Sequence, residues 1–434
     1  MNIETKVNKL DGLKRAITIM VPKGEYVLVF NSSLTKYKSS AKLDGFRAGK
    51  VPEKVILKKY RDRIHNDAMN KLIEDSLMQS LLEHKLDTAS PPKLSIDKAP
   101  SFDNELIFTA EFEIYPLFKV TDLSEISIEE LEVAIDDSDV DNVIKNIQKQ
   151  HMKWEDSKDN SESGDRVVLD YEGTIDGKEF ENNKQKDFSF IIDDDVKGDL
   201  ATINLFKEFY KHCINEKINT EKVFNYNMPK DFSDKNIAGK LINYKILIKK
   251  ISKGTLPKLD KEFYKKFGIS NGTDKIFRDN VIKHMEHELE QKKQSLLTAS
   301  INQKLLEKND FEVPIYMIES EIKNLTNQYK GMMKELDDKT KIDLDNVAKK
   351  RAQLNIIYMK ITEENKIEIK EQEVHDFISK TDTETQNNLI AKIKEDKKYL
   401  NHIKNKLMED AIIKLIVSKC KKNIVKKSFL EVVN

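Results

Sequence analysis

The chain has 434 residues, in which 75 lysines and arginines balance 75 aspartates and glutamates, so its formal net charge is zero. This length predicts about three domains, and the balanced charge argues against a protein that coats nucleic acid along its whole length. Two cysteines, Cys213 and Cys420, are too few for a disulfide framework or a cysteine-rich zinc module. We expect both to be unpaired thiols in a reducing compartment.

The N-terminal sequence has no feature of a secretory signal. No apolar core follows Met1, and the densest apolar runs, such as Tyr26–Phe30, are far shorter than the roughly 20 residues of a membrane helix. We therefore expect a cytoplasmic protein without a membrane partner.

Residues 1–116 are expected to form a small α/β layer. Ile17, Ile19 and Val21 alternate with Ala16, Thr18 and Met20, which predicts a half-buried strand that Pro22 closes. Residues 24–38 favour a helix, and three- and four-residue apolar spacing predicts a longer helix after Pro52. Residues 106–114 are strand-like again. Two strands flanking two helices indicate an α/β layer.

The middle of the chain divides into a connector and a β-rich domain. Residues 117–150 are acidic and helix-prone, as is typical of a connector. Residues 151–251 contain five glycines and short strand-like runs at 167–171, 188–192 and 241–251. These features predict a small β-rich domain.

Residues 252–434 are expected to form an all-α domain. No glycine follows Gly331 and no proline follows Pro314, so helix breakers are missing from the last hundred residues. Apolar residues recur there among lysines and glutamates, and most of them are expected to be helix–helix core. They are Leu289, Leu296, Leu297, Ile301, Leu305, Ile356, Ile357, Met359, Met408, Ile412, Ile413 and Ile416. The predicted fold class is a multidomain α+β protein.

A strongly basic segment lies between Leu34 and Arg63. Ten basic side chains against three acidic ones give it a local charge of +7 in a neutral chain. At its centre stands the octet Gly45-Phe46-Arg47-Ala48-Gly49-Lys50-Val51-Pro52, whose glycines and proline predict a turn between two helices. Phe46 is either an exposed aromatic on a surface for protein and phosphate backbone or a core residue beneath a solvated turn.

This octet resembles the signature of bacterial trigger factor, the ribosome-associated chaperone. Further segments resemble the same family in the same order, among them 112–116, 164–180, 256–268 and 311–319. The resemblance implies a ribosome-docking domain (1–116), a connector (117–150), an FKBP-like prolyl isomerase domain (151–251) and a helical substrate-binding domain with arms (252–434). It also implies that a ribosomal protein at the exit tunnel and large-subunit rRNA are bound at Gly45, Phe46, Arg47, Gly49, Lys50 and Pro52. Family members often carry a basic residue where this chain has Ala48.

The resemblance also implies an isomerase site. Tyr171, Phe180, Phe190 and Tyr244 are the expected pocket residues, because a dry aromatic pocket can favour the twisted imide. The family's Ile-Pro-Gly-Phe-Glu-x-Gly segment is replaced by residues 201–211, which contain neither proline nor glycine. Phe206 or Phe209 then fills the pocket floor. The alternative is that these aromatics are only the core of a small β domain.

No cofactor or metal is expected. The chain has no phosphate-binding glycine loop and no HExxH motif, and His284 with His287 fits a solvated helix better than a metal site. The leading prediction is an ATP-independent holder of nascent and unfolded polypeptides at the ribosome, with a homodimer away from it. The alternatives are a free FKBP-type prolyl isomerase with a helical dimerisation region, and a helical RNA-binding protein.

Overall fold

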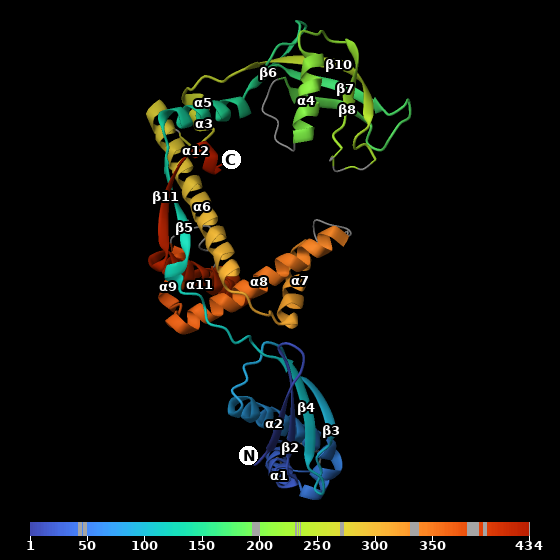
Figure 1. Cartoon of the computed structure of the whole chain (residues 1–434), viewed down its shortest axis with the longest axis vertical. Helices are drawn as coiled ribbons and strands as arrows, with labels where there is room; N and C mark the ends of the chain where they lie inside the picture. The colour runs from blue at the N-terminus through green and yellow to red at the C-terminus, as the bar shows by residue number, and fades with distance from the viewer. Residues whose placement is uncertain are drawn as a thin grey trace. The chain divides into compact units, whose positions relative to one another are not determined.

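The chain folds into two compact units, and each contains two separate stretches of sequence. The computed structural model describes residues 1–41, 46, 50–192, 200–230, 232, 234, 236–269, 273–329, 338–379, 390–393 and 397–433. Unit 1 combines Met1–Leu131 with Gln294–Val425, and unit 2 combines Glu132–Lys293 with Lys426–Asn434. Figure 1 shows the elements and their labels. The α+β multidomain prediction is confirmed.

The N-terminal part of unit 1 is built on a four-stranded antiparallel sheet in the order β1-β2-β4-β3. Its strands are β1 (Glu4–Lys9), β2 (Lys14–Val21), β3 (Lys93–Lys98) and β4 (Leu106–Glu113). The central strands β2 and β4 bury alternate residues, which is why their apolar pattern was visible in the sequence. The two edge strands were not expected, because β3 is exposed at every position and β1 buries none fully.

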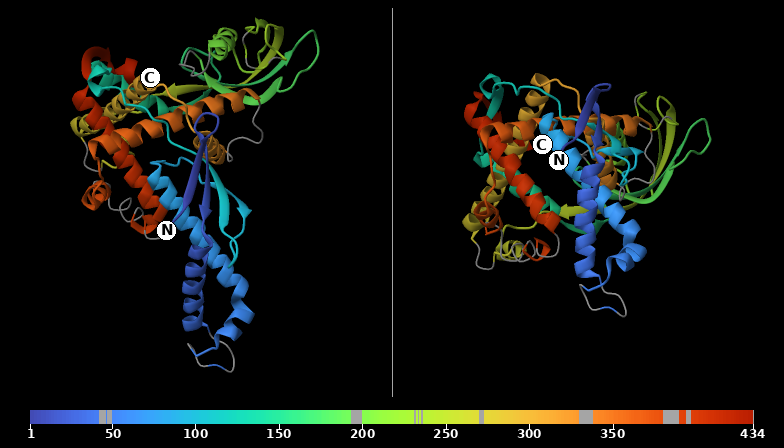
Figure 2. Two further views of the ribbon diagram at one scale, coloured as in Figure 1. Left: turned by 60° about the horizontal axis from the view of Figure 1, so that its bottom comes forward. Right: turned by 90° about the horizontal axis from the view of Figure 1, so that it is seen from below.

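Two helices join this sheet, and a proline precedes each. Helix α1 (Lys23–Ser40) follows Pro22, and helix α2 (Glu53–Glu83) follows Pro52. Proline has no N–H to lose at a helix start and has a suitable φ there. One stripe of α2, with Ile56 and Ile64, is fully buried. The two helices run side by side, with the end of α1 and the start of α2 at the same end of the pair (Figure 2).

The connector is not purely helical. It contains the short 3₁₀ helix η1 (Leu123–Glu125), the strand β5 (Ser127–Ala134) and the helix α3 (Asp137–Gln150). Strand β5 pairs with β11 (Lys421–Ser428), so the expectation of a helix to the end of the chain is wrong there. Acidic side chains of β5 form ion pairs with lysines of β11, namely Lys422–Glu130 at 3.3 Å and Lys426–Glu132 at 3.9 Å.

Unit 2 contains a five-stranded antiparallel sheet. Its path is β6-β10-β7-β8, and β9 also pairs with β10. The strands are β6 (Lys153–Ser157), β7 (Arg166–Thr174), β8 (Lys184–Ile191), β9 (Glu221–Asn227) and β10 (Leu241–Thr255). The long β10 pairs with β9 through its first half and with β6 through its last five residues. Helix α4 (Leu200–Cys213) packs its aromatic face on this sheet.

The remaining elements that the structure describes are helices. They are α5 (Lys261–Lys265), α6 (Asp274–Lys308), α7 (Ile315–Tyr329), α8 (Asp338–Asn365), α9 (Glu371–Ser379), α11 (Lys397–Lys419) and α12 (Phe429–Val433). In unit 1, α6, α8 and α11 bury Ile301, Ile357 and Ile412 against apolar residues of the connector. None of the helices in the described ranges is long and apolar enough to cross a membrane.

Candidate functional site

The turn between α1 and α2 carries an exposed aromatic side chain. Phe46 is 41% exposed, so it does not belong to the core of the N-terminal layer. Next to it, Lys50 is exposed, and Pro52 occupies the position just before α2. Of the other predicted docking residues, Gly45, Arg47 and Gly49 lie outside the residues that the structure describes.

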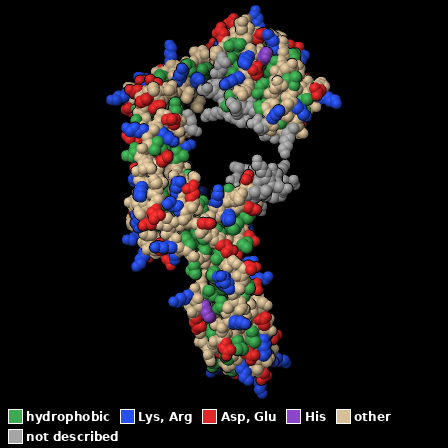
Figure 3. Space-filling view, viewed as in Figure 1, with side chains coloured by type: hydrophobic (Ala, Val, Ile, Leu, Met, Phe, Trp, Pro, Cys, Tyr) green, Lys and Arg blue, Asp and Glu red, His purple; other side chains and the backbone are tan. Residues whose placement is uncertain are grey.

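The flanks of this turn present positive charge. The last turn of α1 and the first turns of α2 display exposed basic side chains, whereas Val51 beneath them is buried. The exposed members are Lys36, Lys50, Lys54, Lys58, Lys59, Arg61 and Arg63. One ion pair, Lys38–Glu53 at 3.1 Å, ties the end of α1 to the start of α2. Elsewhere, on the face seen in Figure 3, basic and acidic side chains are interspersed.

The predicted isomerase residues belong to one aromatic cluster in unit 2. Tyr171 of β7 lies 6.1 Å from Tyr244 of β10, measured between ring centroids, and Phe209 of α4 lies 5.6 Å and 5.4 Å from these two rings. Phe190 of β8 is buried and lies 6.5 Å from Phe209. Strands β7, β8 and β10 each contribute one predicted ring, and α4 closes the cluster over them.

Phe180 lies beside Tyr244 over Gly173, which has no side chain. A Cβ atom on Gly173 would lie 3.3 Å from the Phe180 ring and 3.0 Å from that of Tyr244. The missing side chain at Gly173 therefore lets these two rings approach the sheet closely. Phe180 and Tyr171 are half-buried, whereas Phe190 and Tyr244 are buried in the same core.

Other rings of this cluster were not predicted as site residues. Phe188 lies 5.4 Å from Tyr171, and Phe224 stacks on Tyr244 at 5.5 Å. The sequence shows Phe188 and Phe190 on either side of Ser189, but this pattern does not indicate which of the two rings contacts Tyr171. Burial raises the pKa of Tyr244 to about 12 and also raises the pKa of Tyr171, so both phenols are neutral near pH 7. Prolyl isomerisation passes through a twisted imide and needs no nucleophile, so a neutral apolar cluster is a suitable environment for it.

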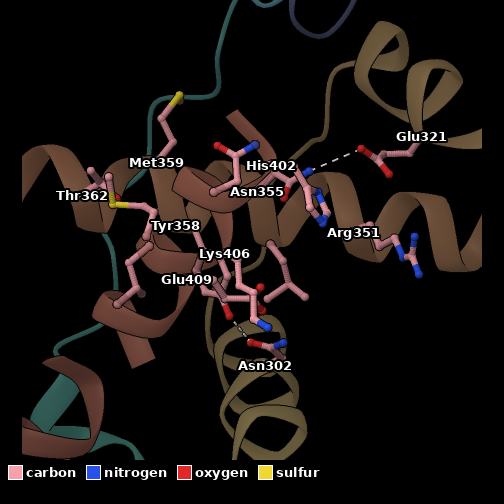
Figure 4. A pocket seen from close by; sticks show the side chains of 14 residues that line it. Asn302, Glu321, Arg351, Asn355, Tyr358, Met359, Thr362, His402, Lys406 and Glu409 are labelled. Carbon is pink, nitrogen blue, oxygen red and sulfur yellow. Dashed lines mark hydrogen bonds between the residues drawn. The ribbon is translucent and has the colours of Figure 1, made fainter. Parts of the chain in front are cut away.

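A groove crosses the helical part of unit 1. It encloses about 930 Å³ and is lined by residues of α6, α7, α8 and α11 (Figure 4). Its lining residues are Asn302, Glu321, Arg351, Leu354, Asn355, Tyr358, Met359, Thr362, His402, Asn405, Lys406, Met408, Glu409 and Ile412. Asn355 donates to Glu321 at 3.5 Å, and the Tyr358 hydroxyl donates to Asn302. Apolar, amide and charged groups of both signs thus share one surface.

The apolar residues of the helical region divide into core and surface. Eight of the twelve predicted members are buried, among them Ile357 and Ile416. Leu296 and Met359 are exposed, and Leu297 and Met408 are half-buried. Met359 and Met408 line the groove, where flexible thioether side chains can adapt to different partners.

Within the described residues, no group of three or more His, Cys, Asp or Glu side chains is arranged to hold a metal ion. His287 of α6 instead makes a 2.8 Å hydrogen bond with the Gln291 amide one helical turn later.

Comparison with known proteins identifies the family. A family model described as bacterial trigger factor protein matches residues 3–147, and a second, for the C-terminus of the same protein, matches residues 275–418. The trigger factor of Idiomarina loihiensis is 27% identical over 438 residues, covering 100% of this chain and 99% of its own. That of Actinobacillus succinogenes is 28% identical over 435 residues and covers 99% of both chains. A solved structure, "Promiscuous Substrate Recognition in Folding and Assembly Activities of the Trigger Factor Chaperone", covers 96% of this chain and 99% of its own at 15% identity, with a TM-score of 0.43.

The family models and the relatives define the class of this protein as a ribosome-associated chaperone. The two models together match about two thirds of the sequence, and the relatives align from end to end. The chain belongs to the bacterial trigger factor family. The alternative of a free isomerase with a dimerisation region is not favoured.

Proposed function

We propose that the turn between α1 and α2 docks the chain beside the exit tunnel, on a ribosomal protein and large-subunit rRNA. The observation that carries this proposal is the exposure of Phe46 at a turn flanked by exposed lysines and arginines. An aromatic ring suits a contact with protein, and cationic side chains suit phosphate oxygens. Gly45, Arg47, Gly49, Lys50 and Pro52 complete the docking segment in this proposal.

The chain is proposed to divide its work among four segments. Residues 1–116 dock, 117–150 connect, 151–251 form the FKBP-like domain, and 252–434 hold nascent or unfolded polypeptide without ATP. The groove with Met359 and Met408 supports the last assignment. Weak contacts at dispersed apolar sites add up on one scaffold, so no single site needs high affinity. In this proposal the protein is cytoplasmic and forms a homodimer when it is away from the ribosome.

The docking proposal is tested by co-sedimentation with purified ribosomes at moderate salt. The double variant Phe46→Ala/Arg47→Ala should lose co-sedimentation and keep its far-UV circular dichroism. A matched control removes an exposed apolar and an exposed basic side chain elsewhere in the same layer, Leu28→Ala/Lys93→Ala, and should pellet like the wild type. Undiminished pelleting of the Phe46/Arg47 variant would refute the proposal.

A weak prolyl isomerase activity is proposed for the aromatic cluster. Tyr171, Phe180, Phe190 and Tyr244 converge there with Phe209, which supports a site that can hold a proline ring. The barrier to be lowered is about 18–20 kcal/mol. A protease-coupled assay with a proline-containing tetrapeptide should give a rate above the uncatalysed one, and Tyr171→Ala should reduce it. A wild-type rate equal to the uncatalysed rate would exclude the activity.

A further inference from the structure

Helix α12 is a short element that is anchored by two buried side chains. It has five residues, of which Phe429 and Val432 are each only 3% exposed. Residues three apart share one face of a helix, so these two side chains point the same way. Ser428 and Glu431 cap its start: the Ser428 N–H and hydroxyl each donate to Glu431 Oε2 at 2.7 Å.

The surface beside α12 is an apolar groove of unit 2. A cavity of about 400 Å³ lies between α3, α6 and α12, and the loop before α6 adds Phe267. Its apolar lining includes Val143, Ile147, Phe267, Phe277 and Met285, and α12 adds Phe429. The Phe267 ring lies 5.4 Å from that of Phe277 and is 39% exposed. The groove therefore extends beyond what α12 fills, and its aromatic wall reaches solvent. Figure 1 shows α12 next to α3 and α6.

Two walls of the groove, α3 and α6, are linked by an arginine with two aspartates. Arg278 of α6 donates to Asp141 of α3 at 2.5 Å and to Asp137 at 3.0 Å. Asp136 caps the start of α3 by accepting from the Asp139 N–H at 2.9 Å. These contacts join α3 to α6 without any side chain of α12.

By contrast, α12 has little stability of its own. A helix of five residues is far below the roughly 12–15 residues at which isolated helices become even marginal in water. Segments with few buried contacts open at lower free energy than the rest of a domain. Opening of α12 would expose an apolar, partly aromatic groove that contains Met285, a side chain that adapts to varied partners.

We propose that this groove is a binding site for short amphipathic helices and that α12 is its resident, displaceable occupant. The ligand class is a helical segment of an unfolded polypeptide with an aromatic and an aliphatic residue three positions apart, as in Phe429 and Val432. This inference rests on the proposed holding of polypeptides, and it adds one specific site and its selectivity. Helix-in-groove recognition uses this spacing of anchors.

The test uses a fluorescent synthetic peptide with the sequence of residues 426–434. It should bind saturably to a chain that ends at Lys427, at least tenfold more tightly than to the full chain. A peptide with the changes Phe429→Ala and Val432→Ala should not bind. Absence of binding to the folded truncated chain, or equal binding to both chains, would overturn the proposal.

A second measurement on the full chain applies even if truncation perturbs unit 2. With excess peptide, hydrogen exchange at the α12 amides should accelerate at least severalfold, while exchange in α6 stays unchanged. Unchanged exchange at α12, with the peptide bound elsewhere, would contradict displacement. Ribosome co-sedimentation does not depend on this groove, so failure of the peptide test and failure of docking remain distinguishable.

Discussion

Phe118 and Phe311 stack face to face although 193 positions separate them in the sequence. Their ring centroids are 4.1 Å apart and their planes are inclined by 24°. Phe118 opens the connector and Phe311 precedes α7, and both rings pack against the helical core of unit 1. The stack therefore fixes the start of the connector onto the helical part of unit 1.

Loss of either ring should destabilise unit 1. For half-buried rings we expect Phe118→Ala or Phe311→Ala to cost about 2 kcal/mol, and a double-mutant cycle to give a coupling of about 1 kcal/mol. Denaturant unfolding followed by far-UV circular dichroism measures both. Leu117→Ala is the control, because Leu117 is 99% exposed and its loss should change little. Strictly additive effects would contradict the stack.

A methyl group at Gly173 should overpack the aromatic cluster. The added Cβ would lie 3.0 Å from the Tyr244 ring and 3.1 Å from Ile242, so Gly173→Ala is expected to cost about 1–3 kcal/mol. Trp154, the only tryptophan, lies in β6 of the same sheet and reports the transition by fluorescence. The contrasting change is Gly24→Ala in α1, where nothing lies within 4 Å and helix propensity should give a gain of about 0.5 kcal/mol.

The two thiols should differ in reactivity. Cys213 is fully buried and burial raises its pKa to about 12, whereas Cys420 is partly exposed with a pKa raised above its ordinary value. With a disulfide reagent at pH 8, Cys420 should react first and Cys213 only after denaturation. Cys420→Ser should abolish the fast phase. Rapid labelling of Cys213 in that variant would show that the β domain opens readily.

Alkaline pH should weaken the β domain through Tyr244. Burial raises its pKa to about 12, against an ordinary value near 10, because the charged phenolate is disfavoured inside. Below pH 10 the phenol is protonated in both states, so no stability is lost. Between pH 10 and 12 only the unfolded chain ionises, and stability falls by about 1.4 kcal/mol per pH unit. Tyr244→Phe should lessen this fall, as measured by urea midpoints at pH 8 and pH 11.

Buried periodic elements could be predicted from the sequence, and exposed edge strands could not. Strand β2 and helix α2 have a fully buried face, so Ile17 and Ile64 stand out in their patterns. Strands β1, β3 and β11 have no such face. The strand state of Ile424 and Val425 depends on pairing with acidic β5, a partner almost 300 residues away. Local sequence in that segment does not reveal the pairing.

The candidate sites were predictable in residue type but not in environment. The sequence singled out Phe46 as a candidate docking residue. It could not decide whether the Phe46 side chain lies in the core or on the surface, because that depends on how α1 and α2 pack. Tyr171 and Tyr244 were named together from the sequence, which left Phe206 and Phe209 open for the pocket floor; the contacts of Phe209 with both tyrosines followed only from the placement of α4 on the sheet. The groove at Met359 was not predicted, because four helices from distant segments form it.

The interleaving of the two units sets an order for biosynthesis. Residues 132–293, which build α3 and most of α6, leave the ribosome before residues 294–425, and α12 comes last. Every copy of this chaperone therefore passes through a stage of translation in which the α3–α6 groove can form while its own helix has not yet been made. A nascent copy should therefore expose this apolar surface to other proteins until α12 has been synthesised.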